Sequence, residues 1–267
     1  MKKIILLAML LIFGCIAQHN KIVASIKPAY LISKSLWETE LLIPPNSNPH
    51  LWEPTPTKTI ALKTALLYVR VAPEFEVWDS DLEKPYTINM SDCIEYKNPH
   101  VWLDPNVAKC TAKKIRDVLV ERYPDKKEEI DERLNKFYND VDEVDEYIKD
   151  RIKEKGKIRY VAYNPAFTHF AKHYGLEEVA VVTKQGEPSL KRINEIIKLM
   201  KREDIHCIFI SKMLNDDVAK QIAIETNSKI IYLDPLGEDA ITYPEILLNM
   251  WKEIEKSKNH PTSFVYC

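Results

Sequence analysis

The feature that most restricts the fold of this chain is a long amphipathic stretch near its middle. After Pro124, apolar side chains recur at spacings of 4, 3, 4, 3, 4 and 4 residues: Ile130, Leu134, Phe137, Val141, Val144, Ile148 and Ile152. This spacing is typical of an α-helix with one apolar face. About 30 residues at 1.5 Å each extend roughly 45 Å. Because the stripe ends at Gly156, we predict a rigid helix over 124–155 that links two domains, rather than a coiled coil.

On both sides of this stretch, short β-rich runs alternate with helical ones. The expected strands are 21–26, 66–71, 158–163, 178–182, 207–211 and 229–233, and the expected helices include 104–122, 189–200 and 215–225. Such alternation indicates βα units around a largely parallel sheet. We therefore predict an α/β fold with two pseudo-symmetric lobes, 19–123 and 156–267, each with a largely parallel sheet flanked by helices.

The first 18 residues are predicted to be a targeting segment. Met1-Lys2-Lys3 is a basic start, and the apolar run from Ile4 to Phe13 is too short to cross a membrane core, which needs about 20 residues. The ending Ile-Phe-Gly-Cys resembles a lipoprotein processing box in which Cys15 becomes the lipid-bearing residue. The alternative is an uncleaved N-terminal anchor. Both interpretations imply that the protein is secreted across the cytoplasmic membrane and anchored at its outer face.

Composition excludes several classes of function. The formal net charge of −2 gives no basic excess for nucleic acid, and five glycines leave little from which to build a phosphate-binding loop. Besides Cys15, the cysteines Cys93, Cys110, Cys207 and Cys267 form no CxxC pair, so a thiolate zinc site is not expected. An oxidising location permits a disulfide, for which Cys93 and Cys110 are close in sequence, but the pairing stays open.

Two histidines share one local pattern. His50 and His100 each lie in Asn-Pro-His-aliphatic-Trp, and proline restricts the backbone beside each imidazole. A single surface histidine is usually a bystander, but two in matching segments indicate a metal site, since imidazole is a common zinc ligand. Asp234 and Asn164 each follow a predicted strand, where ligands of α/β sheets gather. For both, a role in the turn before the following proline is the alternative.

Hydrolytic enzymes have weaker support. His169 and His173 would share one face of a helix, but Phe170 occupies the position where an HExxH metalloprotease needs glutamate. The chain has no GxSxG, and no cysteine in a recognisable nucleophile context. A metal-dependent hydrolase that uses His50, His100 and Asp234, with Glu53 or Asp104 as base, remains the enzymatic alternative.

Several segments together resemble the metal-specific solute-binding lipoproteins of ABC importers, the zinc/manganese (cluster 9, class A-I) group. They are NPHLWEPTP (48–56), NPHVWLDP (98–105), FAKHYGLE (170–177), GEPSLKRINEIIKLMKRE (186–203), IFISKMLND (208–216) and YLDPLGED (232–239). The resemblance implies a non-enzymatic protein that captures zinc or manganese between two lobes and delivers it to a membrane permease. It further implies a monomer without organic cofactor, in which four residues hold the ion: His50, His100, Asn164 and Asp234.

Asn164 departs from the family pattern, in which zinc members carry histidine and manganese members glutamate. A neutral amide oxygen is a poorer zinc ligand than imidazole or carboxylate. Three explanations stay open: a weaker, water-completed site, replacement of Asn164 by His169, or loss of tight binding with a remaining role in adhesion or structure. The continuous helix between the lobes predicts small closure motions.

Overall fold

The computed structural model describes residues 20–95, 98–155, 158–182 and 186–256. The predicted targeting segment with Cys15 lies outside these ranges. The chain divides into two compact units: the first contains Met1–Glu95 and Lys109–Phe137, and the second contains Tyr96–Ala108 and Tyr138–Cys267. Among the described helices, none has the length and apolar character that a membrane crossing requires.

The first unit is built on a parallel sheet of four strands in the order β2-β1-β3-β4. The strands are β1 (Ile22–Ala24), β2 (Thr39–Leu41), β3 (Leu67–Arg70) and β4 (Thr87–Asn89). The connecting helices α2 (Lys27–Leu36) and α3 (Pro56–Lys63) follow β1 and precede β3. The inner strands β1 and β3 are almost wholly buried, as is usual for parallel sheets.

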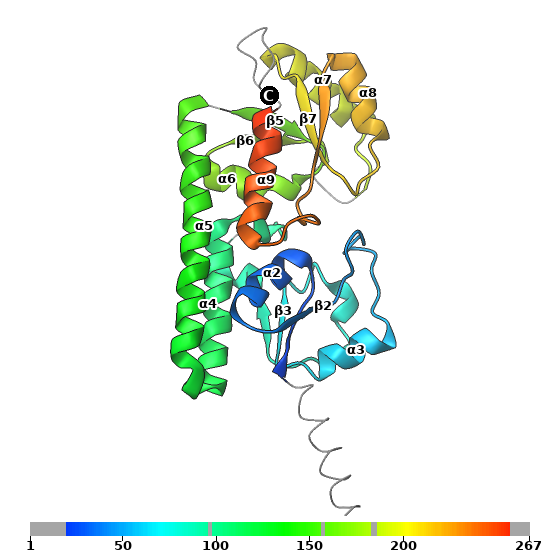
Figure 1. Cartoon of the computed structure of the whole chain (residues 1–267). Helices are drawn as coiled ribbons and strands as arrows, with labels where there is room; N and C mark the ends of the chain where they lie inside the picture. The colour runs from blue at the N-terminus through cyan, green and yellow to red at the C-terminus, as the bar shows by residue number, and fades with distance from the viewer. Residues whose placement is uncertain (1–19, 96–97, 156–157, 183–185, 257–267) are drawn as a thin grey trace, which may run out of the picture. The chain divides into compact units, whose positions relative to one another are not determined.

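The second unit repeats this topology. Its parallel sheet has the order β6-β5-β7-β8, from β5 (Arg159–Ala162), β6 (Glu177–Ala180), β7 (Cys207–Ser211) and β8 (Lys229–Leu233). The helices are α6 (Thr168–Tyr174), α7 (Leu190–Glu203), α8 (Asp217–Thr226) and α9 (Tyr243–Lys256) (Figure 1). The predicted α/β class, with two similar sheets flanked by helices, is therefore confirmed.

The long helix is also confirmed. After a 3-10 turn at Pro124–Lys126, helix α5 runs over Lys127–Lys155, and α4 (Pro105–Arg122) precedes it (Figure 1). Most of the predicted stripe is buried, including Ile130, Val141 and Ile148. Val144 is only half-buried, whereas the neighbouring Asp145 is buried. Lys149 and His173 lie beside its carboxylate and compensate the buried charge.

The two compact units do not coincide with the predicted lobes: the linking helix is divided between them after Phe137, and a segment before α4 also changes unit. Residues 98–108, which the sequence assigns to the N-terminal lobe, belong to the second unit. Their hydrogen bonds explain why: Asn98 bonds to Pro165, and Trp102 bonds to Pro235 and Tyr243. The segment thus carries His100 into the unit that also contains Asn164 and Asp234.

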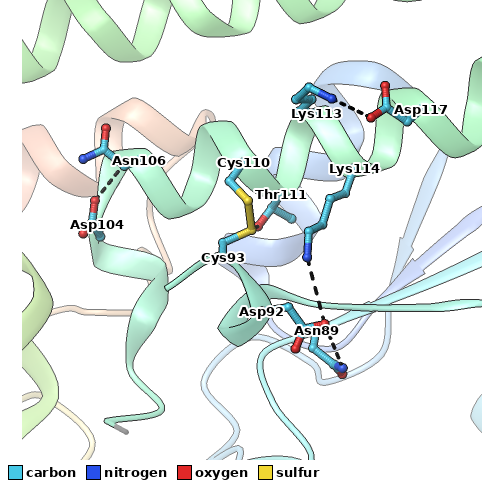
Figure 2. The surroundings of a disulfide bond; sticks show 10 residues. All are labelled: Asn89, Asp92, Cys93, Asp104, Asn106, Cys110, Thr111, Lys113, Lys114 and Asp117. Atoms are coloured by element: carbon cyan, nitrogen blue, oxygen red, sulfur yellow. Dashed lines mark hydrogen bonds and ion pairs between the residues drawn. A yellow bond between two sulfur atoms is a disulfide. The ribbon is translucent and has the colours of Figure 1, made fainter. Parts of the chain in front are cut away.

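One disulfide joins Cys93 to Cys110, with an S–S distance of 2.09 Å and a Cα–Cα distance of 5.9 Å. It connects the 3-10 helix Met90–Cys93 to α4, next to Thr111 (Figure 2). This is the pairing that sequence proximity had suggested. Cys207 is buried in β7 outside the disulfide, and Cys267 lies beyond the described residues.

We expect removal of this disulfide to destabilise the protein. A cross-link over a separation of 17 residues restricts the unfolded chain, so the Cys93→Ser/Cys110→Ser variant should lose about 3 kcal/mol of unfolding free energy. Urea denaturation of the oxidised protein, the dithiol-reduced protein and the variant measures this loss. Reductant should leave the variant unchanged. An identical urea midpoint for oxidised and reduced wild-type protein would contradict the expectation.

Candidate metal centre

The imidazole of His100 is oriented by the side chain of Asn98. The Oδ1 atom of Asn98 accepts a hydrogen bond from the His100 backbone N–H at 3.0 Å and contacts ring Nδ1 at 2.8 Å. Because a carboxamide oxygen only accepts hydrogen bonds, Nδ1 carries the proton. The lone pair of the neutral ring is then on Nε2, which is the arrangement that a metal-binding histidine needs.

Asn98 also connects this segment to the residue after Asn164. Its Nδ2 donates to the carbonyl oxygen of Pro165 at 2.8 Å, and its own carbonyl oxygen accepts from Nε2 of His169, also at 2.8 Å. Asn98 therefore fixes the His100 ring and joins two loops at once. Sequence reasoning did not single it out, although an asparagine precedes the Pro-His pair in both matching segments.

The side chain of Asn164 lacks the hydrogen bond that would cap the turn after it. The residue follows β5 at the start of the 3-10 helix Pro165–Phe167. Its Oδ1 is buried and accepts no hydrogen bond from any residue that the structure describes. A buried acceptor of this kind normally has a partner, and a bound cation or an ordered water would supply one.

Asp234 follows β8, and its carboxylate accepts hydrogen bonds from the turn that comes after it. Its Oδ1 accepts backbone N–H bonds from Leu236 and Gly237, at 3.2 and 2.9 Å, and its Oδ2 accepts one from Glu238 at 2.9 Å. The turn role is therefore real. The two N–H bonds use both lone pairs of Oδ1, whereas Oδ2 accepts one N–H bond and keeps a second lone pair that could face a cation. Gly237 has φ +64°, and a Cβ there would lie 2.5 Å from Ile246, so this turn requires glycine.

Trp102 joins the His100 segment to the Asp234 loop. Its indole N–H donates to the carbonyl oxygen of Pro235 at 2.7 Å, and its own carbonyl accepts from the hydroxyl of Tyr243 at 2.8 Å. All three residues are packed in the second unit, with Trp102 and Tyr243 buried. Together with the Asn98–Pro165 bond, this contact holds the backbone segments of His100, Asn164 and Asp234 to one another.

His50 belongs to the first unit and has the same local backbone arrangement as His100. Asn48 Oδ1 accepts a hydrogen bond from the backbone N–H of His50 at 3.0 Å. The His50 ring packs edge-on against Phe75, with 4.7 Å between the ring centroids. The residue as a whole is exposed, but desolvation of the ring by surrounding protein lowers the pKa of His50. A lowered pKa keeps the imidazole neutral at pH 7, which is the metal-binding form.

The two histidines of α6 have structural partners. His169 is fully buried, and its Nε2 bonds to the carbonyl of Asn98, while burial lowers its pKa. His173 Nε2 lies 2.7 Å from Asp145 Oδ1, and its Nδ1 lies 3.5 Å from Asp104 Oδ1. These contacts favour a supporting role for His169 over its substitution for Asn164.

The two candidates for a hydrolytic base, Asp104 and Glu53, differ in their surroundings: Asp104 caps a helix, and Glu53 is exposed to solvent. Asp104 Oδ1 accepts the backbone N–H of Asn106 at 2.8 Å, which caps α4. Within the described ranges, no group of three or more His, Cys, Asp or Glu side chains is gathered for a metal. The four-residue set of His50, His100, Asn164 and Asp234, which includes an amide, therefore stays a prediction.

Comparison with known proteins assigns the family. The ZnuA family, described as the periplasmic component A of a zinc-uptake complex, matches residues 22–257. A protein of Thermotoga maritima, whose name gives metal binding as a presumed property, is 34% identical over 89% of this chain and 91% of its own length. The high-affinity zinc uptake system protein ZnuA of Bacillus subtilis is 25% identical over 80% of this chain and 78% of its own length.

Solved structures share the fold. A crystal structure of ZnuA aligns with a TM-score of 0.80 at 22% identity, over 89% of this chain and 98% of that one. A zinc-bound ZnuA deletion mutant aligns with a TM-score of 0.81 at 21% identity, over 91% and 99%. The family match extends over both sheets and the long helix. This chain belongs to the ZnuA family, the periplasmic solute-binding components of zinc-uptake complexes.

Proposed function

We propose that this chain captures zinc on the outer side of the cytoplasmic membrane and delivers it to an ABC-type permease. The proposal is supported most directly by the hydrogen bonds that hold the segments of His100, Asn164 and Asp234 together in one unit. Family membership adds the transport role. Manganese, which the sequence left open beside zinc, is named neither by the family nor by these relatives, so we infer zinc as the cargo.

We propose that His50, His100, Asn164 and Asp234 bind the ion. His100 would bind through Nε2, because Asn98 holds the proton on Nδ1. Two neutral imidazoles, an amide oxygen and one carboxylate leave one positive charge of a divalent ion uncompensated. Such a donor set favours moderate affinity and a retained water, which suits a protein that must release its cargo.

We also propose that the protein acts without catalysis, as a monomer attached to the membrane through a lipid on Cys15. A transport component needs to remain near its permease, and a single lipid-modified residue at the start of the mature chain would keep it there. The metal-dependent hydrolase gains no support from the site, since Asp104 caps α4 and pairs with His173.

The ligand set predicts one zinc ion per chain. Calorimetric titration of the metal-free protein should give a one-to-one complex, and His50→Ala, His100→Ala and Asp234→Ala should each weaken it by about 100-fold or more, since each removes one of few ligands. His206→Ala is the matched control, because His206 is half-exposed and bonds to Asp204 at 2.9 Å. Absence of zinc binding by the wild-type protein would instead favour the adhesion or structural role.

Asn164 should limit the zinc affinity. Replacement by histidine supplies an imidazole, a better zinc ligand than an amide oxygen, so Asn164→His should bind zinc at least about tenfold more tightly. Competition with a chromophoric chelator measures both proteins, and Asn164→Ala should be the weakest of the three. A weaker Asn164→His complex would mean that the side chain at this position does not face the ion.

Asn98 should act on affinity through His100. Asn98→Ala removes the acceptor that holds the Nδ1 proton, and loss of such an outer-shell partner typically weakens metal binding about 10- to 100-fold. Asn98→Asp keeps the acceptor for Nδ1 but loses the donor to the Pro165 carbonyl, so its affinity should lie between those of wild type and Asn98→Ala. Asn215→Ala is the control, because Asn215 likewise accepts a backbone N–H, from Asp217, but in another loop. Equal affinities for the alanine and aspartate variants would contradict this role.

A further inference from the structure

Lys212 lies beside Asp234 because of the register of two strands. Strands β7 and β8 are parallel neighbours in which Ser211 is paired with Leu233. Lys212 directly follows β7, and Asp234 directly follows β8. The backbone N–H of Lys212 donates to the carbonyl of Leu233 at 3.0 Å. Neighbouring strands lie about 4.8 Å apart, and paired residues of parallel strands project to the same side. The lysine is therefore fixed at the carboxyl end of the sheet, next to the carboxylate.

The ammonium group of Lys212 reaches this carboxylate. Its Nζ lies 3.8 Å from Oδ2 of Asp234. Both residues line a cavity of about 400 Å³ that β8, the loop at Gly237 and α9 enclose. The Lys212 side chain is 51% exposed and that of Asp234 is 19% exposed, so the lysine has room to move and the aspartate does not.

Asp234 does not need Lys212 to hold its orientation. Three backbone N–H groups, from Leu236, Gly237 and Glu238, already fix both carboxylate oxygens. Removal of the lysine should therefore leave the carboxylate in place and change only the charge around it. This separates an electrostatic effect of Lys212 from a structural one.

We propose that Lys212 is a built-in competitor of the metal ion, which lowers the affinity of the site by neutralising Asp234 and by repelling the cation. The inference rests on the proposed function and concerns how tightly the same site holds zinc. An ion that binds Oδ2 of Asp234 would take the place of the ammonium group at that oxygen, and the displaced lysine would remain close enough to favour release. Because the effect depends on charge alone, it lowers the affinity for every divalent ion alike.

The test compares four proteins: wild type, Lys212→Met, Lys212→Arg and Lys252→Met. Lys212→Met keeps the length of the side chain and removes its charge, whereas Lys212→Arg keeps the charge. Lys252 lines the same cavity and serves as the matched control. Zinc dissociation constants and dissociation rates are measured for each, at low and at high salt, with thermal unfolding to confirm that each variant is folded.

We expect Lys212→Met to bind zinc about fivefold more tightly than wild type at low salt, an effect of the size that one partly exposed charge near a bound ion exerts. Its zinc should also dissociate more slowly. Lys212→Arg and Lys252→Met should match wild type, and the gain should shrink at high salt because the repulsion is screened.

Two failures are distinguishable. If wild type binds zinc in a His100-dependent way and Lys212→Met binds equally or more weakly, the competitor role is wrong and the proposed function stands. A gain that persists unchanged at high salt, or that Lys252→Met shares, also overturns the role. If wild type binds no zinc, the proposed function fails, and the inference fails with it.

Discussion

The arrangement of the candidate ligands in the second unit depends on the hydrogen bonds of the Asn98 carboxamide. One oxygen orients the His100 ring and fixes its tautomer, while the amide nitrogen holds the loop that begins at Asn164. The backbone carbonyl of the same residue accepts from His169, which is buried in α6. Trp102 extends the connection to the Asp234 loop through Pro235. A site built in this way is oriented before its ion arrives, so little ordering remains to be done on binding.

This network also gives structural partners to both histidines of α6. His169 supports the backbone of Asn98, and His173 lies between the carboxylates of Asp104 and Asp145. Asp104 begins α4 directly after the His100 segment, and Asp145 belongs to α5. The imidazoles therefore connect elements that are distant in sequence. They hold the segment that contains His100 in place, although their spacing alone looks like that of a ligand pair.

The sequence predicted the elements whose signals are strong. The stripe of α5 and the apolar run of β7 appear within a few residues of their expected positions, and α4 and α7 begin close to residues 104 and 189, where helices were expected. Strands β2 and β4 were not predicted, because each has only three residues and two of the three are polar. The placement of 98–108 in the second unit also could not be predicted. It depends on hydrogen bonds from Asn98 and Trp102 to residues far along the chain, which no local pattern encodes.

The measurement that tests this account most directly is a crystal structure of the zinc-loaded protein with anomalous scattering at the zinc absorption edge. The account predicts one ion bound by His50, His100 and Asp234 at about 2.0–2.2 Å, with the side-chain oxygen of Asn164 completing the site directly or through a water. The Nδ1–Asn98 contact of His100 should persist in that structure. An ion bound instead by His173 and Asp145, or one that leaves His100 uncoordinated, would contradict the account.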